Sequence, residues 1–139
     1  MVVPIQHLSP EETPVASADQ IRHAVQRYVE LVAAHQPEAV ADLFAADATI
    51  EDPVGSELKI GRAAFVEFYG VIAAMEETTS ELLWSRVAGD TAVFEFRLRV
   101  STAGNGYEVQ PIDIMTFGED GKIASMRAVW DPATDIKIL

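Results

Sequence analysis

Two aspartates stand where a carboxyl group could take part in proton transfer. Asp52 ends a short alternating stretch in which it shares one face with Ala48 and Ile50, so it points toward the apolar interior. Pro53 then stops the stretch and leaves Asp52 at the mouth of the core. Taken alone, Asp52 is more simply interpreted as a surface residue before a turn. A second inward carboxyl group far along the chain, Asp113, favours a chemical role instead.

Asp113 alternates in step with apolar residues of its own predicted strand. Turns about residues 103–106 and 120–121 place aromatic and methionine side chains on the same sheet face, among them Phe94, Phe96, Met126 and Trp130. Burial disfavours the ionised form of a carboxyl group, so Asp113 could stay protonated at neutral pH and donate a hydrogen bond. The alternative is a structural hydrogen bond between Asp113 and a backbone group.

Tyrosine hydroxyls offer further hydrogen-bond donors. Tyr28 falls on the apolar stripe of a predicted helix and Tyr69 on the apolar face of another, where the simpler role of each is ring packing. A neutral Asp113 and Tyr28 together would give two donors in a dry pocket, which is the arrangement that stabilises an oxyanion. Asp52, beside solvent and polar backbone, would keep a more ordinary pKa and act as a base.

Helical periodicity comes first in the chain and strand alternation afterwards. Ser17 and Gln20 predict a capping box at the start of the first helix, Pro37 the first turn of a short second one, and Gly61 the residue before a third. Alternation then predicts antiparallel strands at about Thr79–Ala88, Thr91–Thr102, Tyr107–Phe117 and Lys122–Trp130. Helices followed by strands predict an α+β domain with the helices covering one face of the sheet.

Composition limits the class of protein. The 139 residues predict one domain over residues 17–139, preceded by a flexible tail over residues 1–16 that lacks the basic and apolar regions of a secretory signal. The formal net charge of -12 argues against nucleic acid or an anionic membrane as a partner. The absence of cysteine fits a cytoplasmic location. The three histidines match no metal-ligand spacing.

Four stretches of the sequence carry a resemblance to a known family. They are QRYV at 26–29, FAADATIEDPVGS at 44–56, PID at 111–113 and MRAVW at 126–130. With them the chain resembles, over about residues 21–130, the Δ5-3-ketosteroid isomerases of the nuclear-transport-factor-2-like superfamily. The resemblance implies a cone-like domain in which three N-terminal helices pack on a curved antiparallel sheet and enclose an apolar cavity.

The resemblance also implies roles for individual residues. Asp52 removes a proton from the carbon between the C3 ketone and the Δ5 double bond and returns it to C6, while Tyr28 and Asp113 hydrogen-bond the C3 oxygen. Tyr69 supports Tyr28, no metal or organic cofactor is needed, and the steroid walls are Phe96, Met126 and Trp130. A neutral carboxyl donor is a documented feature of this family, so the resemblance and the burial argument for Asp113 share one basis.

Two features qualify the resemblance. Phe44 stands where some members carry a further tyrosine, which predicts a shorter phenol network. Other members of the superfamily are dehydratases, epoxide hydrolases or transport factors, so the alternative is a noncatalytic steroid- or lipid-binding protein. A carboxylate at the rim favours the isomerase, because a binding protein needs no base there.

The outer face of the predicted sheet suggests a homodimer. That face carries apolar residues among three arginines, namely Leu82, Trp84, Val93, Ile112, Ile114, Ile123 and Val129 with Arg97, Arg99 and Arg127. An apolar area rimmed by charge is typical of an interface. Partial cover by the C-terminal segment 131–139 is the alternative.

Overall fold

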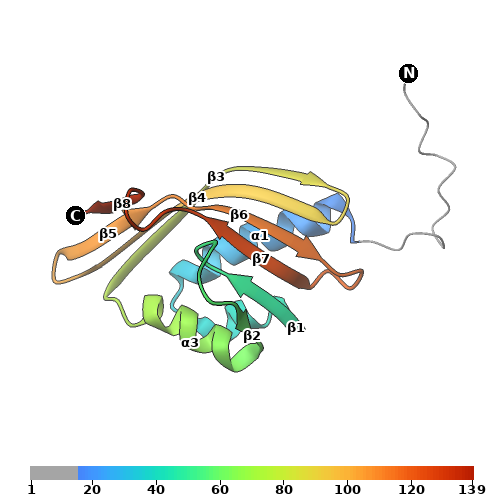
Figure 1. Ribbon diagram of the computed structural model, residues 1–139, viewed down its shortest axis with the longest axis horizontal. Coiled ribbons are helices and arrows are strands. Elements are labelled where there is room, and N and C mark those ends of the chain that lie inside the picture. The colour runs from blue at the N-terminus through green and yellow to red at the C-terminus, as the bar shows by residue number, and fades with distance from the viewer. Residues whose placement is uncertain (1–15) are drawn as a thin grey trace, which may run out of the picture.

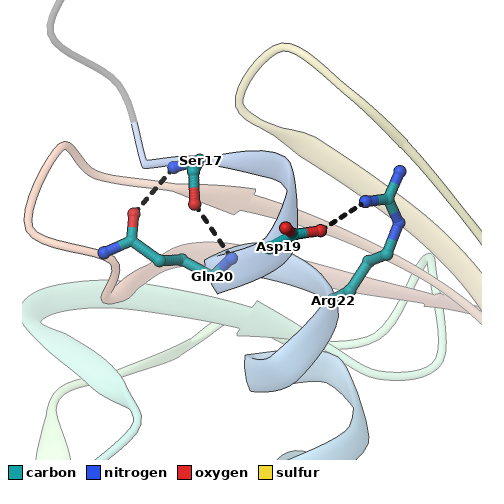
Figure 2. Close-up of polar contacts among 4 residues, drawn as sticks. All are labelled: Ser17, Asp19, Gln20 and Arg22. Atoms are coloured by element: carbon teal, nitrogen blue, oxygen red, sulfur yellow. Dashed lines mark hydrogen bonds and ion pairs between the residues drawn. The ribbon is translucent and has the colours of Figure 1, made fainter.

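The first helix begins at the predicted capping box. The computed structural model describes residues 16–139, and helix α1 (Ala18–Ala33) starts just after this range opens. Figure 2 shows the Ser17 hydroxyl accepting a hydrogen bond from the Gln20 backbone N–H at 3.1 Å, while the Ser17 backbone N–H donates to the Gln20 side chain at 2.7 Å. The predicted tail lies outside the described residues except at Ala16, whose side chain is buried.

Two shorter helices follow. Helix α2 (Pro37–Ala41) has proline in its first turn, as predicted, and helix α3 (Arg62–Ala73) follows Gly61. The φ angle of Gly61 is 88°, a left-handed value that glycine adopts without the clash a Cβ would cause. Helix α2 ends after little more than one turn, and Phe44 is the first residue of the strand that follows.

The strands form one eight-stranded sheet within residues 16–139. They are β1 (Phe44–Glu51), β2 (Lys59–Ile60), β3 (Glu77–Ala88), β4 (Thr91–Thr102), β5 (Asn105–Val109), β6 (Ile112–Phe117), β7 (Ile123–Val129) and β8 (Ile136–Ile138). The order is β2-β1-β7-β6-β4-β5-β8, with β3 paired to β4, and the β1–β7 pair is parallel while the others are antiparallel.

The helices and the sheet enclose the core. In Figure 1 the strands arch over α1 and α3, which lie on the same side of the sheet. Buried residues of α1 pack against the inward face of β4, where Ala92, Phe94, Phe96, Leu98 and Val100 alternate with less buried neighbours. The predicted α+β fold, with three helices packed on a curved and mostly antiparallel sheet, is confirmed.

The strand predicted over residues 107–117 is divided. It breaks at Gln110 and Pro111, because a proline has no N–H for the ladder. The register with β4 continues across the break, with Leu98 opposite Val109 and Phe94 opposite Asp113. Asp113 therefore lies on the inward face that the sequence predicted.

Two residues expected on the outer face lie inward instead. Ile123 is fully buried and Leu82, opposite Phe96, packs against the core. A register irregularity lies beside each of them, between residues 82 and 84 of β3 and between 116 and 117 of β6. An irregularity of this kind shifts the alternation by one residue and so exchanges the two faces.

Candidate active site

A cavity of about 270 Å³ lies between the helices and the inward face of the sheet. Most of its lining is apolar, and it includes five of the predicted site residues, namely Tyr28, Asp52, Tyr69, Phe96 and Trp130. Its volume is just below the range of about 300–1,000 Å³ typical of small-molecule sites, so it suits one small ligand. The resemblance implied such an apolar cavity, and the fold builds one.

The two other predicted site residues, Asp113 and Met126, lie deeper. Both are buried, Asp113 at 1% exposure, and neither forms part of the cavity lining. Met126 lies opposite Met115 in the sheet, and its sulfur is 4.0 Å from the Tyr69 hydroxyl oxygen. Met126 therefore packs behind Tyr69 and outside the cavity lining, because its strand runs through the core layer, and its role as a wall for the steroid stays a prediction.

Two phenols form a pair at the inner end of the cavity. The hydroxyl oxygens of Tyr28 on α1 and Tyr69 on α3 are 2.8 Å apart, and either can be the donor. Phe44 packs edge-on against Tyr28 with ring centroids 6.4 Å apart and carries no hydroxyl, so it does not extend the pair. Burial raises the pKa of both tyrosines well above the usual phenol range, so both hydroxyls stay protonated.

The turn after β1 places Asp52. The Gly55 N–H donates to the Glu51 carboxylate at 3.0 Å, and the Val54 N–H donates to the carbonyl oxygen of Ala128 in β7 at 2.8 Å. Glu51 also accepts from Arg127 at 2.8 Å on the outer side of the sheet. These bonds join the turn to the neighbouring strand, so the backbone on both sides of Asp52 is fixed.

Asp52 has one strong hydrogen-bond donor. The indole N–H of Trp130 donates to Asp52 Oδ1 at 2.7 Å. Burial raises the pKa of Asp52, and this hydrogen bond and the nearby Lys59 charge oppose the rise by stabilising the carboxylate. The pKa of Asp52 is therefore raised above the ordinary carboxyl value by partial burial, but it is shifted less than the pKa of Asp113.

Asp113 is held among apolar groups. Burial raises its pKa well above the ordinary carboxyl value, and the nearby Asp52 charge raises it further. No donor within residues 16–139 reaches its Oδ1 atom, and no lysine or arginine there forms an ion pair with it. A carboxyl group without a compensating charge is more stable protonated in such a place.

These groups can perform acid–base chemistry on an apolar ligand. A carboxylate with a raised pKa is a stronger base, provided that it remains ionised, and the Trp130 hydrogen bond favours ionisation. Protonated phenols in a dry cavity stabilise negative charge that develops on a ligand oxygen. The cavity thus combines one base at the rim with donors at the inner end.

The sequence reasoning missed two features of the cavity. Tyr107 lines the cavity and was not predicted. The sequence pattern could have revealed it, because the alternation through Pro111 and Val109, continued by two residues, places the Tyr107 side chain on the inner face. The hydrogen bond from Trp130 to Asp52 was also missed, because an indole reads as an apolar wall in a sequence pattern. The sequence pattern therefore contained a signal for the place of Tyr107. The hydrogen bond from Trp130 to Asp52 depends instead on how two distant segments approach each other.

Within residues 16–139, no group of three or more His, Cys, Asp or Glu side chains is arranged to hold a metal ion. No helix in the described part of the chain is long and apolar enough to cross a membrane.

Comparison with known proteins places the chain. The SnoaL-like domain model matches residues 25–126. A steroid Delta-isomerase from Nocardioides simplex is 49% identical over 113 residues, which is 81% of this chain and 91% of that protein. A solved structure of SalBIII, described as an epoxide hydrolase/cyclase-like enzyme with a role in pyran ring formation in salinomycin, is 27% identical with a TM-score of 0.79 and covers 87% of this chain and 97% of that one. The chain therefore belongs to the family of SnoaL-like domains, within the nuclear-transport-factor-2-like fold.

Proposed function

We propose that this protein is a steroid Δ-isomerase that converts Δ5-3-ketosteroids into conjugated Δ4-3-ketosteroids through a dienolate. The observation that carries the proposal is that Asp52, in the turn after β1, and Tyr28, on α1, line the same apolar cavity. The similarity to the Nocardioides simplex isomerase supports the same reaction. Because the proton that leaves the steroid is the one that returns, the reaction is balanced without any added reactant.

Asp52 is the base in this proposal. It takes a proton from C4, between the ketone and the double bond, and the electron pair of that C–H bond moves toward the C3 oxygen. The protonated Asp52 then gives the proton to C6, and the double bond shifts into conjugation. Burial raises the pKa of Asp52 and so brings it closer to the pKa of the C4–H bond next to the ketone. The smaller pKa difference makes the proton transfer less unfavourable.

The C3 oxygen becomes negative between the two proton transfers. Tyr28 donates a hydrogen bond to it from the cavity lining, and we propose as the second donor Asp113, which lies deeper than the lining and is kept protonated by its apolar surroundings. Tyr28 has only one proton, so once it donates to the steroid the bond between the two phenols must be donated by Tyr69. Tyr69 thereby strengthens Tyr28 as a donor.

A homodimer through the outer sheet face belongs to the same proposal. Trp84 and Val129 are 42% and 47% exposed on that face, and Val93, Ile112 and Ile114 are partly exposed beside them. The three arginines of this face each form an ion pair, Arg97 with Glu81, Arg99 with Glu108 and Arg127 with Glu51. The C-terminal segment approaches one edge of this face, since Asp131, Pro132 and Asp135 line a surface pocket together with Ile112 and Val129, while β8 extends the sheet beside β5.

The test is the isomerisation of 5-androstene-3,17-dione, followed by the ultraviolet band of the conjugated enone. The wild-type protein should produce the band, and Asp52→Asn, which keeps the shape but lacks basicity, should lose about 10²–10⁴-fold in kcat. Asp47→Asn is the matched control, since Asp47 is exposed on β1, the strand that ends just before Asp52.

Two outcomes would contradict the proposal. Near-full turnover by Asp52→Asn would remove the proposed base. Steroid binding by the wild-type protein without any turnover would favour the noncatalytic binding protein.

A further inference from the structure

Tyr107 brings a third phenol to the cavity, in addition to the Tyr28–Tyr69 pair. Its side chain lines the cavity and is partly buried. Within residues 16–139 its hydroxyl makes no hydrogen bond, whereas the hydroxyls of Tyr28 and Tyr69 bond each other. A tyrosine hydroxyl in an apolar wall usually has a polar partner.

Burial decreases along the inward face of β6 and β5 from Asp113 to Tyr107. Along this face the side chains of Asp113, Pro111 and Val109 are buried, and Tyr107 is the first that is partly exposed. Tyr107 is six positions before Asp113 in the sequence, so their Cα atoms lie at most about 20 Å apart along an extended strand. An elongated ligand that has one end beside the Tyr28–Tyr69 pair and extends toward the mouth therefore ends near Tyr107.

The backbone around Tyr107 is fixed. Tyr107 lies opposite Val100 of β4 on one side and opposite Ile138 of β8 on the other. The N–H of Leu139 also donates to the carbonyl oxygen of Gly106 at 3.0 Å. The strand that carries the phenol is thus paired at both edges, so the hydroxyl is positioned before a ligand arrives.

Most of the cavity wall that Tyr107 shares is apolar. Val71 and Ile72 of α3, together with Leu98 and Val109 of the sheet, line the cavity and present no hydrogen-bonding side chain. Burial raises the pKa of Tyr107 and the nearby Asp52 charge raises it further, which keeps the phenol protonated. A neutral phenol can donate to a carbonyl oxygen or exchange a hydrogen bond with a hydroxyl.

We infer that Tyr107 binds an oxygen atom at the far end of the steroid, and so determines how strongly the protein favours 3-ketosteroids with a carbonyl or hydroxyl group on ring D over those without one. The inference rests on the proposed function, because it places the C3 oxygen at the inner end of the cavity. Tyr107 is a specificity-determining residue and takes no part in the proton transfers. Its contact is the same before and during the reaction, so its loss should appear in KM.

The experiment compares Tyr107→Phe with the wild-type protein on two steroids that differ in one oxygen. They are 5-androstene-3,17-dione and 5-androsten-3-one, which lacks the C17 oxygen. The variant should lower the ratio of kcat/KM between the dione and the monoketone by about three- to tenfold, as expected for one neutral hydrogen bond. Glu108→Gln is the control, because Glu108 lies next to Tyr107 in sequence and outside the cavity lining, and it should leave the ratio unchanged.

Binding of the two conjugated products, measured by calorimetry, separates this inference from the proposed reaction. If the wild-type protein binds both products without turnover, and Tyr107→Phe weakens only the binding of 4-androstene-3,17-dione, the isomerase fails and the Tyr107 contact stands. If turnover occurs and the variant changes neither the kinetic nor the binding ratio, the Tyr107 contact is overturned. If neither product binds, both are overturned.

Discussion

Replacing Trp130 by phenylalanine should move the acid limb of the pH–activity profile to higher pH. The Trp130 N–H donates to Asp52 at 2.7 Å, and phenylalanine keeps an aromatic ring but has no N–H. Burial raises the pKa of Asp52 and this hydrogen bond lowers it, so removing the bond leaves the rise less opposed. The base must be ionised to accept a proton, and the variant therefore needs a higher pH to reach full activity.

The size of the effect follows from the two protonation states of Asp52. A hydrogen bond to a charged group contributes about 1.5–3 kcal/mol and one to a neutral group about 0.5–1.5 kcal/mol. The bond is lost in both states, so only the difference of about 1–1.5 kcal/mol changes the ionisation equilibrium. At about 1.4 kcal/mol for each tenfold change, the acid limb should move up by about one pH unit.

The assay is kcat/KM for the isomerisation measured from acid to neutral pH, since its acid limb reports the free enzyme. Trp84→Phe is the matched control, because the Trp84 indole donates to Glu95 at 2.8 Å outside the cavity. Its acid limb should not move. A Trp130→Phe variant that loses activity at every pH with an unmoved limb would refute the reasoning, since Trp130 would then contribute packing alone.

Two further predictions concern Asp113 and the outer face. Asp113→Asn keeps a donor and should lose modestly in turnover, whereas Asp113→Leu cannot donate and should lose about 10²–10³-fold; equal losses would contradict the donor role. The protein should sediment as a dimer at micromolar concentration, and Val129→Glu should shift it toward monomer by placing a charge on the exposed apolar face; a monomeric wild-type protein would rule out the interface.

The inward carboxyl and phenol groups could be predicted because strand and helix periodicities fix which residues share a face. Tyr28 lies in the buried stripe of α1, and Asp113 lies opposite Phe94 in the register that the turn about residues 103–106 determines. Both assignments depend on local geometry and on one turn. They therefore survive the break at Pro111, which interrupts the strand without changing its register.

Other features depend on contacts between distant segments. Leu82 and Ile123 lie on the opposite face from the prediction because each lies beside a register irregularity, and no local pattern marks those places. The parallel pairing of β1 with β7 brings Asp52 near Trp130, although 78 residues separate them. That pairing decides the hydrogen bond and the burial that set the pKa of Asp52, and alternation along one strand carries no information about it.

The proposed roles of the two aspartates require different charge states, with Asp52 ionised and Asp113 protonated. The Asp52 charge raises the pKa of Asp113, so an ionised base at the rim helps to keep Asp113 protonated. In the proposed reaction the negative charge leaves Asp52 as it takes the proton and appears on the C3 oxygen, so the cavity carries one negative charge at every stage. An ionised Asp113 would add a second charge in an apolar site with no cation to offset it. In this proposal the inner carboxyl therefore works as a donor throughout the cycle, and the proposed reaction moves one charge from the rim to the inner end and back.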